Sequence, residues 1–171
     1  MTLDMMRAAL IAMAANRSDE SWLAGSSVIA PFLERVPNDI DIHHLQQKAF
    51  DYAIERDTNE LAGVGFVVTA SKVSSTEHER TFAHAQGNVA VNWVLEAGPP
   101  PPLVLDPSLG VRANYAAIVA RKIEMYKHDG LIKHREDLHC LLRNVPFVGA
   151  ELDIAWLRFQ LAALGILNAN S

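Results

Sequence analysis

The amino-acid sequence predicts an α+β protein, in which a mixed sheet with helices is followed by a helical unit. Apolar residues repeat with helical spacing at the start and in the second half of the chain, and stretches rich in β-branched and aromatic residues lie between. The stiff, proline-rich run 98–102 separates the two parts and is the best candidate boundary. We expect an α/β core over residues 1–97 and a C-terminal helical unit over 98–171, packed on the core as a single compact protein.

The first half of the chain is expected to alternate helices with strands. The spacing of Met5, Ala9 and Met13 predicts an amphipathic helix that ends near Asn16. The other elements expected here are a buried strand at 22–24, a short helix at 28–33, a strand at 39–42, a helix at 45–61 that ends at Gly63 or Gly65, and strands at 66–73, 80–85 and 89–95, the last two joined by a turn at 86–88.

Beyond the proline-rich run, every element is expected to be helical. The apolar pattern predicts helices over 114–128, 131–143 and 151–164. Turn residues separate them: Asp129 and Gly130 stand between the first two helices, and Pro146 and Gly149 between the last two.

Composition narrows the possible functions. Half of the 171 residues are apolar and a fifth are charged, which is enough to build a globular core. The net charge of -5 argues against broad, sequence-blind nucleic-acid binding but leaves room for a local basic groove. Cys140 is the only cysteine, and its apolar neighbours predict a buried thiol. Since no apolar run approaches the roughly 20 residues of a membrane span, we expect a cytoplasmic protein without a membrane partner.

Two carboxylates separated by one residue stand on the strand predicted at 39–42. Residues i and i+2 of a strand point to the same face, so Asp39 and Asp41 can bind one hard cation while Ile40 and Ile42 face the core. Mg²⁺ is typically held by one or two carboxylates together with substrate phosphates. Alone, such a pair could equally be a solvated part of a turn and strand.

A glycine–serine segment follows the preceding strand. Gly25 allows the backbone to approach a ligand closely, and the amides and hydroxyls of Ser26 and Ser27 can bind phosphate oxygens. Each of the two signals is weak alone. In the order strand, Gly-Ser, short helix, turn and Asp-x-Asp strand they become considerably more specific, and they predict a site for a metal-bound nucleoside triphosphate.

The segment LAGSSVIAPFLERVPNDIDI resembles the opening of nucleotidyltransferase-fold proteins of the DNA polymerase β-like superfamily, most closely the AbiEii type, which includes toxin and abortive-infection members. In that pattern an arginine precedes the Asp-x-Asp strand, and Arg35 occupies its place, either as a nucleotide-binding residue or as a structural partner of the two aspartates. A second match, ANYAAIVARKIEMYKHDGLIKHREDLHCLL, resembles a helix pair in which a lysine and an aspartate complete the site. Lys122 and Asp137 stand there.

The resemblance implies a Mg²⁺-dependent (or Mn²⁺-dependent) nucleotidyltransferase that moves a nucleotidyl group from an NTP, such as ATP, to an acceptor, with release of pyrophosphate. It implies catalytic roles for Asp39, Asp41, Lys122 and Asp137, with Asp39 and Asp41 on the metal. The acceptor of such an enzyme could be an RNA, such as a tRNA, or a protein. An exposed helix lysine paired with Asp137 is the structural alternative for Lys122.

The sequence also departs from the pattern. Many members of the superfamily carry a third carboxylate on a later strand, where this chain has Asn92, which has no charge and cannot act as a general base. Glu96 or Asp137 could supply the missing charge. Lys133 and His134 stand where relatives often have Arg-Asp. The alternative function is therefore a catalytically degenerate protein that binds a nucleotide or a partner.

The charged residues and histidines suggest two further hypotheses, a zinc site and a basic patch. Seven histidines raise the possibility of zinc, but His134 and His139 are five apart, and His43 and His44 point to opposite faces of a strand. Five basic residues lie in the segment 121–135, either on a solvated helix pair or in a patch that receives RNA or another anionic acceptor; they are Arg121, Lys122, Lys127, Lys133 and Arg135.

Overall fold

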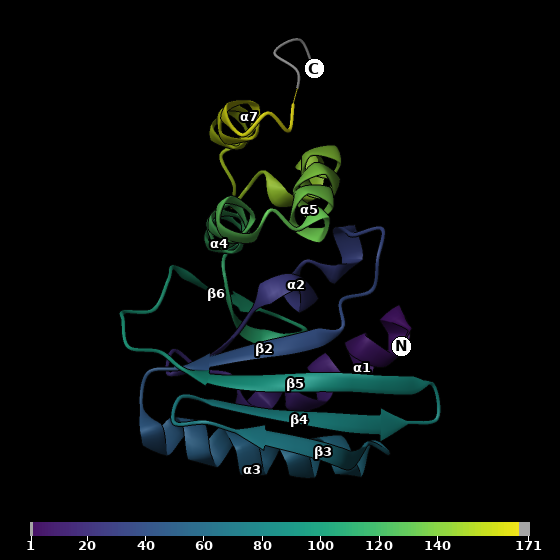
Figure 1. The fold of residues 1–171 in the computed structure, drawn as a ribbon. Helices are drawn as coiled ribbons and strands as arrows, with labels where there is room; N and C mark the ends of the chain where they lie inside the picture. Colours follow the sequence, from purple (N-terminus) through teal and green to yellow (C-terminus); the bar gives the residue numbers. More distant parts are fainter. Residues whose placement is uncertain (1, 168–171) are drawn as a thin grey trace. The chain divides into compact units, whose positions relative to one another are not determined.

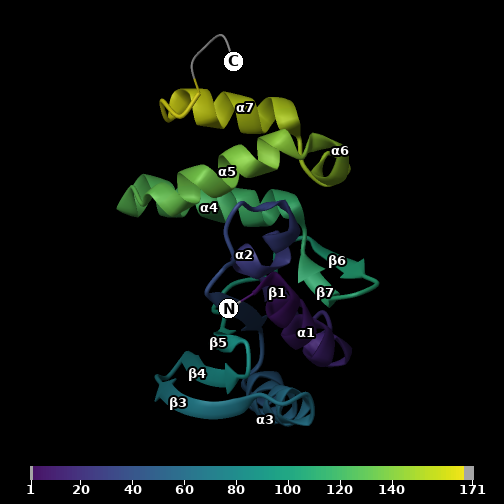
Figure 2. The ribbon, with the colours of Figure 1, turned by 90° about the vertical axis from the view of Figure 1, so that its right-hand side faces the viewer.

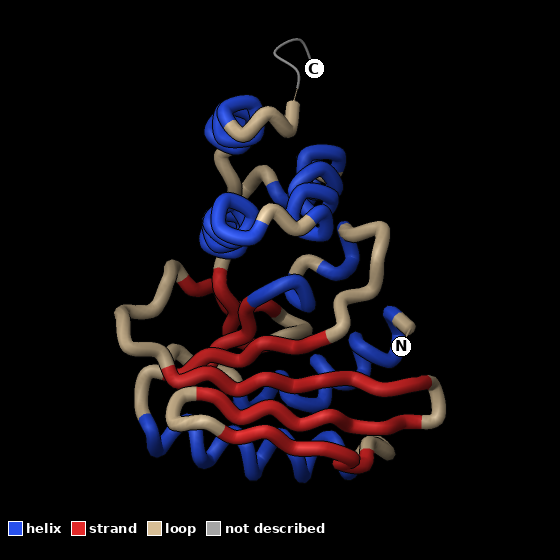
Figure 3. Tube along the Cα trace, viewed as in Figure 1, coloured by secondary structure: helices blue, strands red, loops and turns tan. Residues whose placement is uncertain are grey.

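The computed structural model describes residues 2–167 and divides into two units. The first comprises the residues up to Pro31 together with Arg35–Ala113, and the second comprises Phe32–Glu34 together with the residues from Asn114 onward. The first unit combines a sheet with helices, whereas the second is helical throughout its described part (Figure 3). The predicted α+β class is confirmed.

A seven-stranded mixed sheet forms the first unit, in the order β3-β4-β5-β2-β1-β7-β6 (Figure 1). Pairing is parallel between β2 and β5 and between β1 and β7, and antiparallel between the other neighbours. Strand β2 therefore lies inside the sheet, between β1 and β5. The strands are β1 (Ser21–Ala24), β2 (Asp39–His44), β3 (Val67–Val73), β4 (Glu77–His84), β5 (Gly87–Leu95), β6 (Leu103–Asp106) and β7 (Gly110–Ala113).

Two helices, α1 (Leu3–Met13) and α3 (Gln47–Gly63), cover one face of the sheet (Figure 2). Their apolar stripes and the inward residues of the strands form the core. The stripe of α1 matches the predicted amphipathic helix, and the 3-10 helix Ala14–Asn16 extends it to its predicted end. The fully buried core residues of this unit include Met5, Met6, Met13, Trp22, Leu23, Ile40, Ile42, Leu61, Phe82 and Trp93.

The change to purely helical structure comes at Asn114 and not at the proline-rich run 98–102. The expectation that every element beyond this run is helical is wrong for residues 103–113, which form the antiparallel hairpin β6–β7. Asp106 stabilises the hairpin turn, because its Oδ1 accepts hydrogen bonds from the backbone amides of Ser108 (2.9 Å) and Leu109 (3.1 Å). Strand β7 then extends the sheet by pairing in parallel with β1.

Smaller differences concern the element ends. The short helix after β1 is α2 (Gly25–Val28) and begins three residues earlier than predicted, and a 3-10 turn, Ala30–Phe32, follows it. Strand β4 begins at Glu77 instead of residue 80. Strand β2 continues two residues beyond the predicted end at Ile42 and so includes both His43 and His44.

The helical unit contains α4 (Tyr115–Asp129), α5 (Ile132–Arg143), the single turn α6 (Val145–Val148) and α7 (Ile154–Ala163). The three longer helices correspond to the predicted ones, although α7 begins three residues after the predicted start at 151. Helix α4 is capped at its start by the Asn114 side chain, which accepts from the Ala117 amide, and ends at Gly130 with φ +66°. Cys140 is buried, as predicted. Among the described residues, no helix combines the length and apolar character that crossing a membrane requires.

Side chains of β2 alternate between the two faces of the sheet, and this alternation positions the site. Asp39, Asp41 and His43 point away from α1 and α3, whereas Ile40, Ile42 and His44 are fully buried on the helix side. His44 shares a 3.0 Å hydrogen bond with the Ser21 hydroxyl. Burial, followed by the charge of Arg17, lowers the pKa of His44 to about 3, so this imidazole is neutral in the folded protein.

We expect His44 to make folding stability depend on pH. The unfolded chain takes up a proton near pH 6.5, whereas the folded chain cannot do so until about pH 3. The contribution of His44 is therefore fully present above pH 6.5 and falls by about 1.4 kcal/mol per pH unit as the pH drops below it. Urea unfolding of the wild type and His44→Gln between pH 8 and 4.5 measures this. A stability gap that stays constant with pH would contradict the prediction.

Candidate functional site

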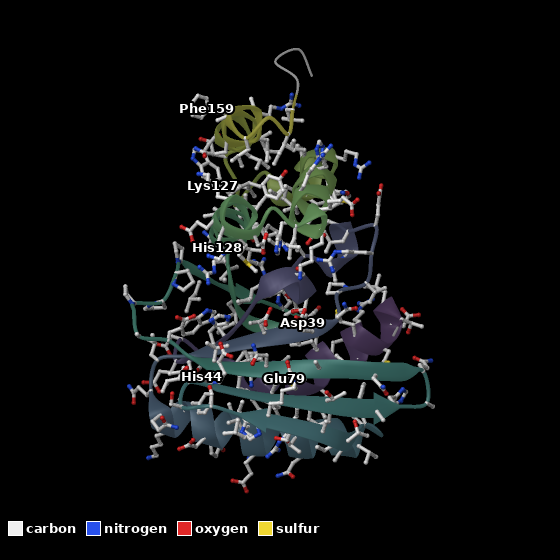
Figure 4. All side chains as sticks on the ribbon, in the orientation of Figure 1. Asp39, His44, Glu79, Lys127, His128 and Phe159 are labelled. Carbon is white, nitrogen blue, oxygen red and sulfur yellow. The ribbon has the colours of Figure 1, made fainter. Side chains whose placement is uncertain are left out.

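Strand β2 presents Asp39, labelled in Figure 4, on the face of the sheet that α1 and α3 leave uncovered. By the alternation of the strand, Asp41 lies on the same face. The Asp39 residue is exposed and Asp41 is half-buried. This is the arrangement that the alternation of the DIDI segment predicts. Two carboxylates side by side on one face can act together on a ligand that approaches the sheet from this side.

The backbone at Gly25 touches the Asp41 carboxylate. Gly25 ends β1 in the left-handed conformation, with φ +69°, and a Cβ atom at this position would lie 2.0 Å from Asp41 Oδ2. The strand register explains the closeness, because Ala24 is the antiparallel partner of Asp41. Only glycine fits here, for both steric and conformational reasons. The structure therefore brings together the two segments that the sequence singled out.

Three side chains at this turn, those of Ser26, Ser27 and Arg35, differ in their contacts and exposure. The Arg35 guanidinium donates a hydrogen bond from Nη2 to Ser26 Oγ at 3.2 Å, which places a positive charge at the Gly-Ser turn. Ser27 is only 1% exposed, and its hydroxyl donates to the Ala24 carbonyl at 3.3 Å. The Ser26 side chain and the Arg35 guanidinium are thus the better placed groups for an anion at this turn.

Asn92 lies directly beside Asp41 on the neighbouring strand β5, and Ala90 lies beside Asp39. The next residue in the same row is Glu79 on β4, which pairs with Asn92 in the register (Figure 4). Glu79 is held by the ammonium of Lys72 at 3.0 Å. The uncharged Asn92 amide therefore separates the aspartates from the next carboxylate of the sheet, that of Glu79. No sequence pattern singled out Glu79.

His43 and Glu96 form a pair at the other end of β2 that the sequence pattern does not reveal. His43 Nδ1 lies 2.5 Å from Glu96 Oε1, and the ring stacks on Trp22 with a centroid distance of 6.0 Å. The sequence offers Glu96 as a substitute for the missing strand carboxylate, but in the structure Glu96 pairs with His43. The feature of the sequence that could have identified His43 is the alternation of the strand, since His43 follows Asp39 and Asp41 at a spacing of two residues.

The donor set at β2 fits a hard divalent cation. Asp39 and Asp41 supply carboxylate oxygens on one face, and the absence of a side chain at Gly25 makes room for the Asp41 carboxylate. Within residues 2–167 no cluster of three or more His, Cys, Asp or Glu side chains is arranged to hold a metal by itself. A cation bound here would therefore take its remaining ligands from substrate and water.

In the helical unit, Lys122 and Asp137, the two residues that the resemblance singles out, form an ion pair with each other. Lys122 Nζ on α4 lies 2.7 Å from Asp137 Oδ2 on α5, and both side chains are almost fully buried, at 4% and 2% exposure. His134 lies one turn before Asp137, with Nε2 3.4 Å from Asp129 Oδ2. Burial, followed by the charge of Lys122, lowers the pKa of His134. The four other members of the basic segment 121–135 are exposed.

Comparison with solved structures gives the fold. The protein JHP933 from Helicobacter pylori matches 94% of this chain and 87% of its own, with a TM-score of 0.52 and 10% identity. The polyadenylate synthase of Megavirus matches 96% of this chain and 36% of its own, with a TM-score of 0.50 and 10% identity. An H. pylori protein provisionally assigned as a nucleotidyltransferase matches 94% of this chain and 90% of its own, with a TM-score of 0.48 and 11% identity. The first two of these matches show the nucleotidyltransferase fold.

The likeness to these structures is one of fold, which agrees with the fold that the sequence resemblance implied. No protein-family model matches the chain. No curated protein sequence matches it either. In the first unit, Gly25, Ser26, Arg35 and Asp41 meet at one turn, and Asp39 follows on the same face of β2. In the helical unit, Lys122 is paired with Asp137.

Proposed function

We propose that this protein transfers a nucleotidyl group from a nucleoside triphosphate to an acceptor and releases pyrophosphate, with Mg²⁺ or Mn²⁺ as the metal. The observation that carries the proposal is the contact of the Gly25 backbone with the carboxylate of Asp41, beside Asp39 on the open face of the sheet. A phosphate-binding turn placed against a pair of metal-binding carboxylates is the minimum that this chemistry requires.

Asp39 and Asp41 would hold the cation, which would neutralise charge on the phosphoryl oxygens. Backbone amides at Gly25 and Ser26, the Ser26 hydroxyl and the Arg35 guanidinium would bind the triphosphate and offset the charge of the leaving pyrophosphate. Ser27 would contribute through its backbone amide, since its hydroxyl is bonded to Ala24.

For Lys122 and Asp137 we keep the roles that the AbiEii-type resemblance implies, phosphate binding and completion of the catalytic site. These roles rest on the resemblance alone, because the buried ion pair between the two side chains satisfies both charges without a ligand. On the same resemblance we propose that the chain is of the AbiEii type and acts in a toxin-antitoxin setting.

The proposal of an RNA acceptor rests on the resemblance, because the hollow on α5 carries as many carboxylates as guanidinium groups. Arg135, His139 and Arg143 recur every four residues and so share one face of the helix, where they line a hollow of about 310 Å³. Glu34 and Glu136 line the same hollow, and Glu34 pairs with Arg143 at 2.9 Å. A protein acceptor is the second possibility for the proposed reaction.

One observation favours a second function, a nucleotide-binding protein without catalysis. Asn92 stands beside Asp41 where a third carboxylate would complete the metal site. Calorimetry with each NTP and Mg²⁺, combined with an assay for pyrophosphate, separates the two functions. Binding together with pyrophosphate release in the presence of an acceptor pool supports the transferase, and binding without release supports the degenerate protein.

The proposed site is tested with the double variant Asp39→Asn and Asp41→Asn. We expect Mg²⁺-dependent incorporation of labelled NTP into a cell lysate to fall at least about 100-fold, because the amides keep the shape of the carboxylates but lose the charge that binds the cation. Asp19→Asn, an exposed turn residue, is the matched control and should keep wild-type incorporation. Unchanged incorporation in the double variant would refute the assigned site.

A further inference from the structure

We propose that His43, held by Glu96, binds the attacking hydroxyl of the acceptor and aligns it with the α-phosphorus of the nucleotide. The inference rests on the proposed nucleotidyl transfer and adds to it the group that receives the nucleophile. It adds a hydrogen-bond acceptor for the nucleophile on the strand that carries both aspartates.

His43 is on the correct face of the sheet for this role. It follows Asp39 and Asp41 at a spacing of two residues on β2, so the three side chains point in the same direction. The His43 side chain is 22% exposed, whereas its neighbour His44 is fully buried on the opposite face. A ligand lying on the carboxylates can therefore reach the imidazole of His43.

Glu96 fixes the orientation of the ring. The carboxylate lies 2.5 Å from Nδ1 of His43, and a carboxylate in this position accepts the Nδ1–H hydrogen bond, which leaves the lone pair on Nε2. Within the described residues Nε2 of His43 makes no hydrogen bond. The stack of the ring on buried Trp22 fixes its plane as well. The result is an oriented hydrogen-bond acceptor beside the metal-binding carboxylates.

The strand register places the Gly25-Ser26 turn and His43 on opposite sides of Asp41. Along β1, Ala24 pairs with Asp41 and leads directly into the Gly25-Ser26 turn, while Trp22 pairs with His43. A triphosphate anchored at Gly25, Ser26 and Arg35 thus has its leaving pyrophosphate on one side of Asp41, and the opposite side is lined by His43. In phosphoryl transfer the attacking and leaving oxygens lie roughly in line, as they would with the acceptor at His43 and the pyrophosphate at the Gly25-Ser26 turn.

In the proposed step the acceptor hydroxyl donates a hydrogen bond to His43 Nε2. Its oxygen forms a bond to the α-phosphorus as the bond from this phosphorus to the pyrophosphate oxygen breaks. The hydroxyl proton is released to solvent, and pyrophosphate leaves with the electron pair of the broken bond. His43 touches the reacting hydroxyl, and Glu96 is a positioning residue that acts through His43.

Two substitutions at His43 separate this role from a structural one. In His43→Asn the amide can still reach Glu96 from the position of Nδ1 but has no atom at the position of Nε2. In His43→Gln an amide oxygen can occupy the position of Nε2. The measurements are the affinity for each of the four NTPs with Mg²⁺ by calorimetry, the initial rate of label transfer into a fixed amount of cell lysate, and the urea unfolding midpoint.

We expect His43→Asn to keep its unfolding midpoint and its nucleotide affinity within about 3-fold, and to lose about 100-fold in transfer rate, because a misaligned nucleophile costs about that factor. His43→Gln should recover part of the rate, and Glu96→Ala should lose transfer with unchanged nucleotide affinity. Wild-type transfer in His43→Asn, or an equal loss of nucleotide binding, would overturn the role of His43 alone. A wild-type protein that transfers no label would overturn the proposed function and this inference together.

Discussion

Gly25→Ala is expected to lose at least about 100-fold of nucleotidyl transfer while the protein stays folded. The new Cβ would lie 2.0 Å from Asp41 Oδ2, a distance at which one of the two groups must move. Displacing a catalytic group by about 1 Å costs about 100-fold in rate. The alanine would also sit at φ +69°, a left-handed conformation that costs about 1 kcal/mol for a residue with a Cβ.

Gly63→Ala is the matched control for this substitution. Gly63 lies at the end of α3, and a Cβ added there meets no atom within 4 Å, so its stability and transfer rate should equal those of the wild type. The measurements are label transfer and the urea unfolding midpoint of both variants. Full activity in Gly25→Ala would show that the contact between this turn and Asp41 has no part in the reaction.

Asp57→Ala is expected to destabilise the first unit by about 3–5 kcal/mol. Asp57 on α3 is fully buried and receives hydrogen bonds from Arg17, from the Trp93 indole at 2.8 Å and from the Asn16 amide at 2.9 Å. Without the carboxylate, the Arg17 guanidinium is left buried with no counter-charge, and removal of one partner of a buried ion pair costs about this much.

Denaturant unfolding measures the loss, with Asp51→Ala as the control on the same helix. Asp51 is exposed and accepts one hydrogen bond from Gln47, so its removal should cost no more than about 0.5 kcal/mol. The double variant Arg17→Met and Asp57→Leu should recover part of the stability, because it removes both charges together. An Asp57→Ala protein as stable as Asp51→Ala would contradict this account of the core.

The predictable parts of the fold are those that local patterns specify. The Met5, Ala9 and Met13 stripe became the buried face of α1, and the alternation of DIDI became β2 with its two carboxylates on one face. The hairpin β6–β7 was missed because its strands are four residues each and depend on a turn held by Asp106 and on parallel pairing with β1, neither of which a local pattern contains.

The residues of the candidate site also differ in whether a local pattern predicts them. Gly25-Ser26 and Asp39-x-Asp41 are close in sequence, and their spacing alone predicted that they meet. The pair of His43 and Glu96 is separated by 53 residues and depends on the register between β2 and β5. The position of Asn92 beside Asp41 was expected only through the family resemblance, and its cross-strand neighbour Glu79 follows from the β4–β5 register.

The most direct test of nucleotidyl transfer compares two positions of the label. The wild-type protein is incubated with Mg²⁺, a cell lysate and an NTP that carries the label on either the α- or the γ-phosphorus, and both the acceptor fraction and free pyrophosphate are counted. The account predicts that the α-label enters the acceptor and the γ-label appears in pyrophosphate. Label from the γ-position in the acceptor, or no label in it from either position, would contradict the account.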